Sequence, residues 1–238
     1  MSRGWLLWLL AACAEGGPSS STTDGGTDAC TPTTFFTDSD GDLHGDPNRP
    51  LMACEQPAGT VTTADDCDDN SAQRYPGLAE ICDGLDNDCT GTTGESCPAG
   101  CLPMRRPAPD DSRVYLMCSS SVSWTTARTT CMGAQYKLAQ IEDAEENAFI
   151  RNTATTLYGA VDLHIGGSDL ITEGTWIWDG SDPFWMGGSG GTAIMNRYAN
   201  WVPGEPNNDG NEDCGEIKPS GQWNDGNCGD GQRFVCRR

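Results

Sequence analysis

Positive charge is scarce in this chain of 238 residues. Lys and Arg together number 14, against 35 Asp and Glu, so the formal net charge is -21. A surface with this charge repels the phosphates of nucleic acids and the headgroups of anionic membranes. Nucleic acid is therefore excluded as an expected partner, and a metal cation or a neutral ligand is favoured.

Histidine and the common catalytic motifs are also lacking. The only histidines are His44, in an acidic segment, and His164, whose apolar surroundings are typical of a core residue. No G-x-S-x-G, H-E-x-x-H or P-loop pattern occurs. The remaining carboxylate pairs, which a glycosidase would also need, are better explained as cation ligands. We therefore expect a binding protein and no enzyme.

Long hydrophobic runs are absent. The run 5–12 follows Arg3 and is much too short to span a bilayer, but it suits a signal peptide. Its end, Leu10-Ala11-Ala12-Cys13, resembles the lipobox of bacterial lipoproteins. The resemblance implies removal of residues 1–12, lipidation of Cys13 and anchoring of the exported protein at the outer membrane or cell surface. The alternative is an ordinary secretory signal cut further along.

Cysteine, by contrast, is abundant, with 13 residues in the chain. Their spacing matches no repeated C-x-x-C pair of the zinc-ribbon kind, and so many cysteines are not typical of a reducing cytosol. The sequence therefore predicts export to an oxidising compartment. If Cys13 carries a lipid, twelve cysteines remain, which permits six disulfides.

Composition divides the chain into segments. Residues 13–29 contain almost nothing that could be buried, which predicts a disordered tether. Residues 30–97 hold eleven Asp and three Glu against two Arg, together with six cysteines, and are expected to form a small, cross-linked acidic unit. Four prolines make 98–113 a predicted linker. Six of the eight tryptophans lie in 114–238, so we expect the main core there.

Helix signals precede strand signals within 114–238. Trp124, Ala127 and Cys131 share one face of a first helix, with a serine before it as N-cap. Asp143 and Glu146 predict a capping-box-like start of a second helix. Short β-rich segments then follow at 161–165, 175–178, 215–217, 222–223 and 233–236. Helices followed by antiparallel strands indicate the α+β class.

The acidic unit contains a pattern typical of calcium loops. Asp38, Asp40 and Asp42 alternate along the chain, with a glycine for the turn, although no Glu completes an EF-hand. Crowded carboxylates repel one another unless a cation or water intervenes. We therefore expect Asp38, Asp40 and Asp42 to hold Ca2+. A solvated acidic spacer is the alternative.

Two further acidic clusters, at 65–70 and 82–89, accompany a Tyr-Pro-Gly triplet at 75–77. Together they resemble an acidic, cysteine-containing metal-binding repeat of secreted bacterial proteins. The resemblance implies a cation without identifying it. The six cysteines of the unit allow 15 pairings, among which the sequence does not choose.

Three polar triplets follow one another near the C-terminus, at 205–207 (Glu-Pro-Asn), 212–214 (Glu-Asp-Cys) and 223–225 (Trp-Asn-Asp). Their side chains offer the oxygens that calcium prefers. The ordered set resembles the sugar-binding end of C-type lectin domains. Further family landmarks, such as Ile165-Gly166-Gly167-Ser168-Asp169 and Glu173-Gly174-x-Trp176-x-Trp178, extend the resemblance over 114–238.

The resemblance implies a C-type lectin-like domain with two helices, antiparallel strands and a long calcium-binding loop, preceded by a small disulfide-rich acidic domain. It implies a cis peptide bond before Pro206. It also implies disulfides that join Cys131 with Cys236 and Cys214 with Cys228, with Cys101 and Cys118 as a further pair.

By the same resemblance, two groups of residues would bind Ca2+. A primary ion is expected on Glu205, Asn207, Glu212, Asn224 and Asp225, and an auxiliary ion on Asp169, Glu173, Asn208 and Asp213. Of the primary ligands, Glu205, Asn207, Glu212 and Asn224 would also exchange hydrogen bonds with a pair of sugar hydroxyls.

By the same resemblance, the order Glu-Pro-Asn implies mannose-type glycans rather than galactose. One alternative keeps the calcium for stability or for protein binding, without a sugar. At the auxiliary position the alternative is a hydrogen-bonded loop without metal.

Overall fold

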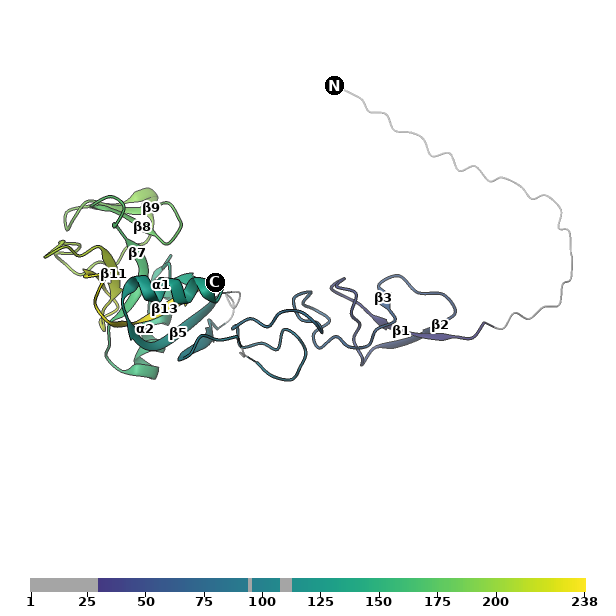
Figure 1. Ribbon diagram of the computed structural model, residues 1–238. Helices are drawn as coiled ribbons and strands as arrows, with labels where there is room; N and C mark the ends of the chain where they lie inside the picture. Colours follow the sequence, from purple (N-terminus) through teal and green to yellow (C-terminus); the bar gives the residue numbers. More distant parts are fainter. Residues whose placement is uncertain (1–29, 94–95, 108–112) are drawn as a thin grey trace, which may run out of the picture.

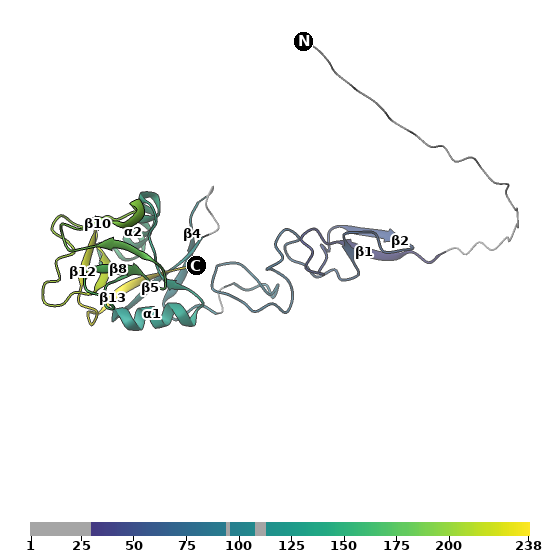
Figure 2. The same ribbon diagram turned by 90° about the horizontal axis from the view of Figure 1, so that it is seen from above.

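The computed structural model describes residues 30–93, 96–107 and 113–238. The predicted signal peptide (1–12), the lipidation site Cys13 and the tether lie outside the described residues. Figures 1 and 2 show β1–β3 at one end of the described chain and both helices, with the larger sheet, at the other. No helix in the described ranges is long and apolar enough to cross a membrane.

The first part of the acidic unit is a small three-stranded sheet. Its strands are β1 (Thr33–Thr37), β2 (Pro50–Ala53) and β3 (Thr60–Val61), in the antiparallel order β2-β1-β3. Of the side chains of these strands, Phe35 is the buried hydrophobic one. So little apolar burial stabilises a fold only weakly, and the disulfide Cys30–Cys54 reinforces it.

The second part of the acidic unit, which begins at residue 66, is built from turns. Its disulfides are Cys67–Cys89 and Cys82–Cys97. Cys82 is buried against the C-terminal half of the chain, where the Tyr136 hydroxyl donates a hydrogen bond to the Cys82 carbonyl at 2.7 Å. The acidic unit is thus packed against its neighbour at this end.

The segment 98–113, predicted as a linker, contributes a strand, so the prediction is wrong for residues 101–105. These residues form β4 (Cys101–Arg105), which pairs antiparallel with β5 (Val114–Val122). The strand contains Pro103, which has no N–H to donate, yet β4 lies at the edge of the sheet. An edge strand tolerates proline because one side needs no partner.

The two predicted helices are present as α1 (Trp124–Gly133) and α2 (Ala144–Tyr158). Ser123 and Asp143 cap them by accepting hydrogen bonds from backbone N–H groups. The Glu146 carboxylate accepts a hydrogen bond from the N–H of Glu142 (2.7 Å) and one from the buried Tyr115 hydroxyl (2.5 Å). The capping box is therefore only half formed, because Glu146 does not return to the cap residue.

The larger sheet has ten strands and confirms the α+β class. Its main path runs β10-β9-β8-β7-β13-β5-β4, with β11 joined to β7 and β12, and β6 joined to β13. Figure 2 shows α1 and α2 on opposite sides of β5 and β13. The remaining elements are β6 (Lys137–Leu138), β7 (Leu163–Ser168), β8 (Thr175–Trp178), β9 (Pro183–Met186), β10 (Thr192–Ala193), η1 (Ile194–Asn196), β11 (Cys214–Ile217), β12 (Trp223–Gly226) and β13 (Gln232–Arg237).

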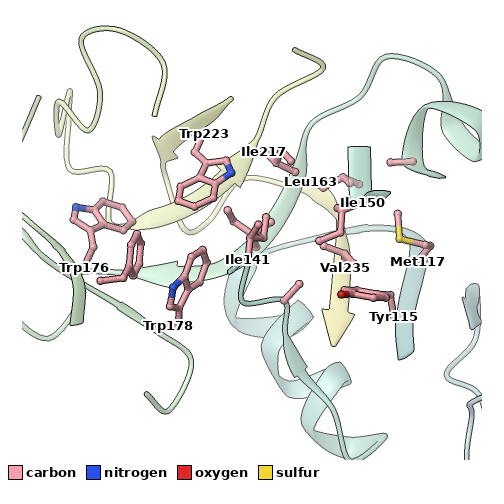
Figure 3. Close-up of a cluster of buried hydrophobic side chains, with 14 residues drawn as sticks. Tyr115, Met117, Ile141, Ile150, Leu163, Trp176, Trp178, Ile217, Trp223 and Val235 are labelled. Carbon is pink, nitrogen blue, oxygen red and sulfur yellow. The ribbon is translucent and has the colours of Figure 1, made fainter. Parts of the chain in front are cut away.

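Aromatic residues dominate the core under the polar loop. Trp176, Trp178 and Trp223 are almost fully buried and face the aliphatic side chains of the sheet and α2, as Figure 3 shows. The indole N–H of Trp223 donates to Asn147 Oδ1 at 2.8 Å. Trp223 thus fixes the start of β12, the strand that carries the third polar triplet.

Three disulfides join the pairs implied by the resemblance. Cys131–Cys236 ties α1 to β13 across 105 residues, and Cys214–Cys228 closes the end of the β11–β12 hairpin. Cys101–Cys118 links β4 to β5. In the chain-entropy account, the closure of a loop of about 100 residues contributes roughly 4 to 5 kcal/mol.

Candidate functional site

The first two polar triplets lie in the loop that leads into β11, and the third lies in β12. The Glu205–Pro206 peptide is cis, as the resemblance implied. Asp225 is fully buried in β12, and its Oδ2 accepts hydrogen bonds from the backbone N–H groups of Asn207 (2.8 Å) and Asn208 (2.7 Å). Asp225 therefore holds the loop against the sheet. This position is next to Asn207, another residue of the expected primary calcium group.

Two carboxylate oxygens at this junction are buried and accept no hydrogen bond from the part of the chain that the structure describes. They are Asp225 Oδ1 and Glu205 Oε2. Burial, followed by a hydrogen bond that protonated Glu205 can make with the Asp225 carboxylate and by the charge of Asp225, raises the pKa of Glu205 to about 7. Burial and Asp225 also raise the pKa of Glu212. Two desolvated carboxylates this close repel each other when both are ionised, and a hard cation such as calcium, which takes carboxylate oxygens, relieves that repulsion.

Asparagine side chains shape the loop itself. Asn207 Oδ1 accepts from the N–H of Asp209 at 2.7 Å, and Asn208 Oδ1 accepts from the N–H of Glu212 at 2.8 Å. Asn208 and Asn211 have positive φ angles, which asparagine tolerates better than most residues. The side chains of Asn207 and Asn208 stay exposed at the rim.

Asn224 is oriented differently from the prediction. Its Nδ2 donates to Glu216 Oε1 at 3.0 Å and to the carbonyl of Asp225, so its amide hydrogens face the protein. A free donor toward a sugar is therefore not present at Asn224 in this structure. Glu216 is buried and also pairs with Lys218 Nζ at 2.8 Å.

Glu216 was not among the predicted site residues, although a signal for it exists. It lies directly opposite Asn224 in the antiparallel register of β11 and β12. If the second and third triplets are predicted to flank a β-hairpin, Glu216 and Asn224 become cross-strand neighbours, whose side chains lie on the same face of the sheet.

Three of the four proposed auxiliary ligands, Asp169, Glu173 and Asn208, line one hollow. Asp169 is almost fully buried; its Oδ2 accepts from the N–H of Gly174 at 2.9 Å, and its Oδ1 has no hydrogen-bond partner among the described residues. Burial, then the charges of Glu173 and Asp213, raise its pKa to about 6. The backbone N–H of Asp169 donates to the carbonyl of Asp213 at 3.2 Å. The hollow is also lined by Asn207 and Asp225 of the primary group.

The acidic unit brings Asp38, Asp40 and Asp42 together as predicted, with one oxygen of each within 4.8 Å of the others. Glu80, Asp86 and Asp88 form a second such group. In the described residues these are the two groups of three that meet this distance. The carboxylates of the C-terminal loop therefore stand farther apart than those of the acidic unit.

The C-terminal half is therefore an α+β domain with two helices and a sheet in which β5 pairs with the last strand, β13. Its polar loop carries buried carboxylate oxygens and is a candidate cation site. A family model described as "Lectin C-type domain" matches residues 120–238, half of the chain. The chain belongs to this family. A second model, described as "Putative metal-binding motif", matches residues 66–95.

Curated relatives agree with the family. The chain is 36% identical over 124 residues to C-type lectin domain family 4 member M of Gorilla gorilla gorilla, which covers 52% of this chain and 30% of that protein. It is 33% identical over 146 residues to perlucin of Haliotis laevigata, covering 60% of this chain and 83% of perlucin. The chain thus spans less than a third of the length of the first of these relatives.

Among solved structures, the mouse scavenger receptor C-type lectin carbohydrate-recognition domain is 25% identical. That match covers 60% of this chain and 95% of the other, with a TM-score of 0.47.

Proposed function

We propose that the C-terminal half of this protein binds carbohydrate in a calcium-dependent way and prefers mannose-type sugars. The observation that carries the proposal is the pair of buried oxygens Glu205 Oε2 and Asp225 Oδ1, which accept no hydrogen bond among the described residues and lie beside exposed loop residues. A buried carboxylate without a partner is costly, and a bound cation removes that cost. Membership in the C-type lectin family supports a sugar as the ligand.

Some of the primary ligands would contact both the ion and the sugar, and others only the ion. Calcium, when bound, offers open coordination positions to a pair of neighbouring hydroxyls. Glu205 and Glu212 accept hydrogen bonds from those hydroxyls, while the exposed amide of Asn207 donates one. Asp225 stays buried and fixes the loop. No proton transfer or covalent step is required, so binding rather than catalysis is the activity.

The donor and acceptor order of the loop gives the sharpest test. The double variant Glu205→Gln and Asn207→Asp exchanges the acceptor and the donor at the rim while keeping side-chain size. We expect its preference to move from mannose toward galactose on a glycan array in millimolar calcium, with no retention of either sugar in chelator. An unchanged preference would show that these two residues do not contact the sugar.

Calcium without a sugar is a second candidate function, favoured by Asn224. Because its amide hydrogens are held by Glu216 and the protein backbone, one donor of the sugar-binding set is occupied. A calcium-stabilised protein-interaction module needs no such donor. If the wild-type protein retains no glycan on the array, yet calcium still raises its thermal unfolding midpoint, the second candidate is supported.

A lipid on Cys13 would place the domain at a bacterial surface, with the segment 13–29 as its tether. A single shallow site binds a sugar weakly, on the order of millimolar, and many anchored copies would convert this into useful adhesion. Metabolic labelling with a radioactive fatty acid in a bacterial host should label the wild-type protein. The Cys13→Ser variant should lose the label, and equal labelling of both would rule out this anchor.

A further inference from the structure

A second hollow lies beside the start of α2. It has a volume of about 320 Å³ and is lined by three segments: 140–142 before the helix, the end of β8 with the turn that follows it, and 197–198. We call it the aromatic hollow, after its lining residues Trp178 and Tyr198. Among the described residues, it shares no lining residue with the hollow at the candidate calcium ligands. Its volume is in the lower part of the range of small-molecule sites.

Trp178 provides a hydrogen-bond donor without an acceptor. The residue is 2% exposed, yet its indole N–H donates to no residue in the described ranges. The similarly buried Trp124 and Trp223 do donate, each at 2.8 Å. A buried indole N–H usually has such a partner. The nitrogen of Trp178 is not among the fully buried unpaired atoms of the described chain, so a molecule in the aromatic hollow can reach it.

The neighbours of Trp178 fix the direction of this N–H. A Cβ atom on Gly167 of β7 would lie 3.5 Å from Trp178 Cζ3. Cζ3 is at the edge of the indole opposite the N–H, so the N–H points away from β7. The ring also stacks on Phe184, with 4.2 Å between the ring centroids. The donor is therefore held in place before a ligand binds.

Tyr198 provides a second unpaired donor. Its hydroxyl has no hydrogen-bond partner in the part of the chain that the structure describes, whereas the hydroxyls of Tyr115 and Tyr158 both donate. Burial, followed by the charge of Asp143, raises the pKa of Tyr198, so its hydroxyl stays protonated at neutral pH. Its ring packs edge-on against Trp223, with 5.4 Å between the ring centroids. Both unpaired donors thus belong to rings that the aromatic core holds.

The charged side chains that line the aromatic hollow already have partners. Glu142 Oε2 lies 2.7 Å from Arg113 Nη2 and 3.2 Å from Arg237 Nη2. Arg197 Nη2 lies 3.5 Å from Asp182 Oδ2, and Arg197 Nη1 donates to the Asp182 carbonyl at 3.0 Å. Because two arginines hold the carboxylate of Glu142, the hollow offers calcium no free ligand. A neutral ligand is therefore favoured.

Gln140 adds groups that both donate and accept. Its Oε1 accepts from Ser181 Oγ at 3.2 Å, and its Nε2 donates to Glu142 Oε1 at 3.1 Å. An amide has two N–H groups and two lone pairs on its oxygen, so one of each remains. Sugar hydroxyls donate and accept in the same way, and the C–H faces of a sugar ring pack on aromatic side chains. The hollow therefore matches a sugar ring.

We propose that the aromatic hollow binds a neutral sugar ring without calcium. The N–H of Trp178 and the O–H of Tyr198 donate to oxygens of the sugar, and the amide of Gln140 exchanges hydrogen bonds with a hydroxyl. This site is additional to the calcium-dependent site of the polar loop and does not depend on it. Two sugar sites on one domain would strengthen its attachment to a glycan that reaches both.

Nuclear magnetic resonance of the isotope-labelled full-length chain tests the proposal, with indole N–H signals as reporters. The Trp178 signal, identified by its loss in Trp178→Phe, reports on the aromatic hollow. The Trp185 signal reports on the polar loop, because its N–H donates to the carbonyl of Gly187, which lines the hollow at the candidate calcium ligands. Methyl α-mannoside or methyl β-galactoside should shift the Trp178 signal in chelator and in calcium alike, with a dissociation constant on the order of millimolar.

The variant Tyr198→Phe removes the hydroxyl and keeps the ring against Trp223. In calcium, the dissociation constant measured from the Trp178 signal should therefore rise about threefold or more, while the response of Trp185 stays unchanged. The control Tyr75→Phe makes the same chemical change in the acidic unit and should behave like the wild type.

Two results would overturn the proposal. One is a Trp178 signal that neither sugar shifts in calcium. The other is a Trp178 shift that Tyr198→Phe leaves undiminished and that follows the Trp185 shift at every sugar concentration, since the effect is then transmitted from the polar loop. Failure of the calcium-dependent function looks different: Trp185 does not respond to either sugar in calcium, while Trp178 still does.

Discussion

A buried polar residue in the C-terminal half, Asn147, helps to position the strand that carries part of the candidate sugar site. Asn147 on α2 is buried, donates from Nδ2 to the Gly221 carbonyl at 2.8 Å and accepts from the Trp223 indole at 2.8 Å. It thereby fastens the β11–β12 hairpin to the helix. Asn224 and Asp225 follow Trp223 directly, so loss of the Asn147–Trp223 hydrogen bond is expected to displace these two proposed ligands.

Asn147→Ala should lower the free energy of unfolding by about 2 kcal/mol, because the indole N–H of Trp223 is then buried without a partner. The Gly221 carbonyl keeps its bond from Asn200 Nδ2, which limits the cost. Urea denaturation in calcium measures the change. Asn152→Ala, on the exposed face of the same helix, is the matched control. Equal midpoints for both variants would contradict the anchoring role.

The residues of the site differ in how far the sequence predicts them. Asp169 and Asp225 are recognisable because each belongs to a fixed motif, and the structure buries both with one oxygen unpaired. The orientation of Asn224 is not predictable in that way, since it depends on Glu216 across the hairpin.

At the scale of elements, local signals predict the helices well and the strands unevenly. Both helices begin at the residues indicated by their caps, since an N-cap is a contact of a few residues. The strand β8 agrees with its predicted range of 175–178, where aromatic and β-branched residues lie between turn residues. These elements carry their own signals.

The strands β5 and β4 show where such signals fail. β5 has a buried run at its start and three serines near its end, so no regular alternation marks it. β4 contains a proline and is recognisable only through its partner, to which the disulfide Cys101–Cys118 also joins it. These two strands form because they pair with segments distant in the sequence. Such pairing is not visible when each segment is analysed by itself.

At the scale of the whole molecule, negative charge is concentrated where cations are proposed. The net charge of -21 opposes a compact state unless it is screened or bound. The candidate sites at the two ends of the described chain are built in the same manner, from carboxylates whose second oxygen is buried and unpaired. The protein should therefore depend on calcium for stability in both halves, independently of any sugar.

Removal of calcium tests this dependence. At a free calcium concentration of 100 times the dissociation constant, one site contributes about 2.7 kcal/mol to the folded state. Chelator should therefore lower the thermal unfolding midpoint, measured by calorimetry. In chelator, added sodium chloride should recover part of the loss because it screens the repulsion between carboxylates, whereas in saturating calcium it should change the midpoint much less. Matching midpoints in calcium and chelator would show that the unpaired oxygens hold no ion that stabilises the fold.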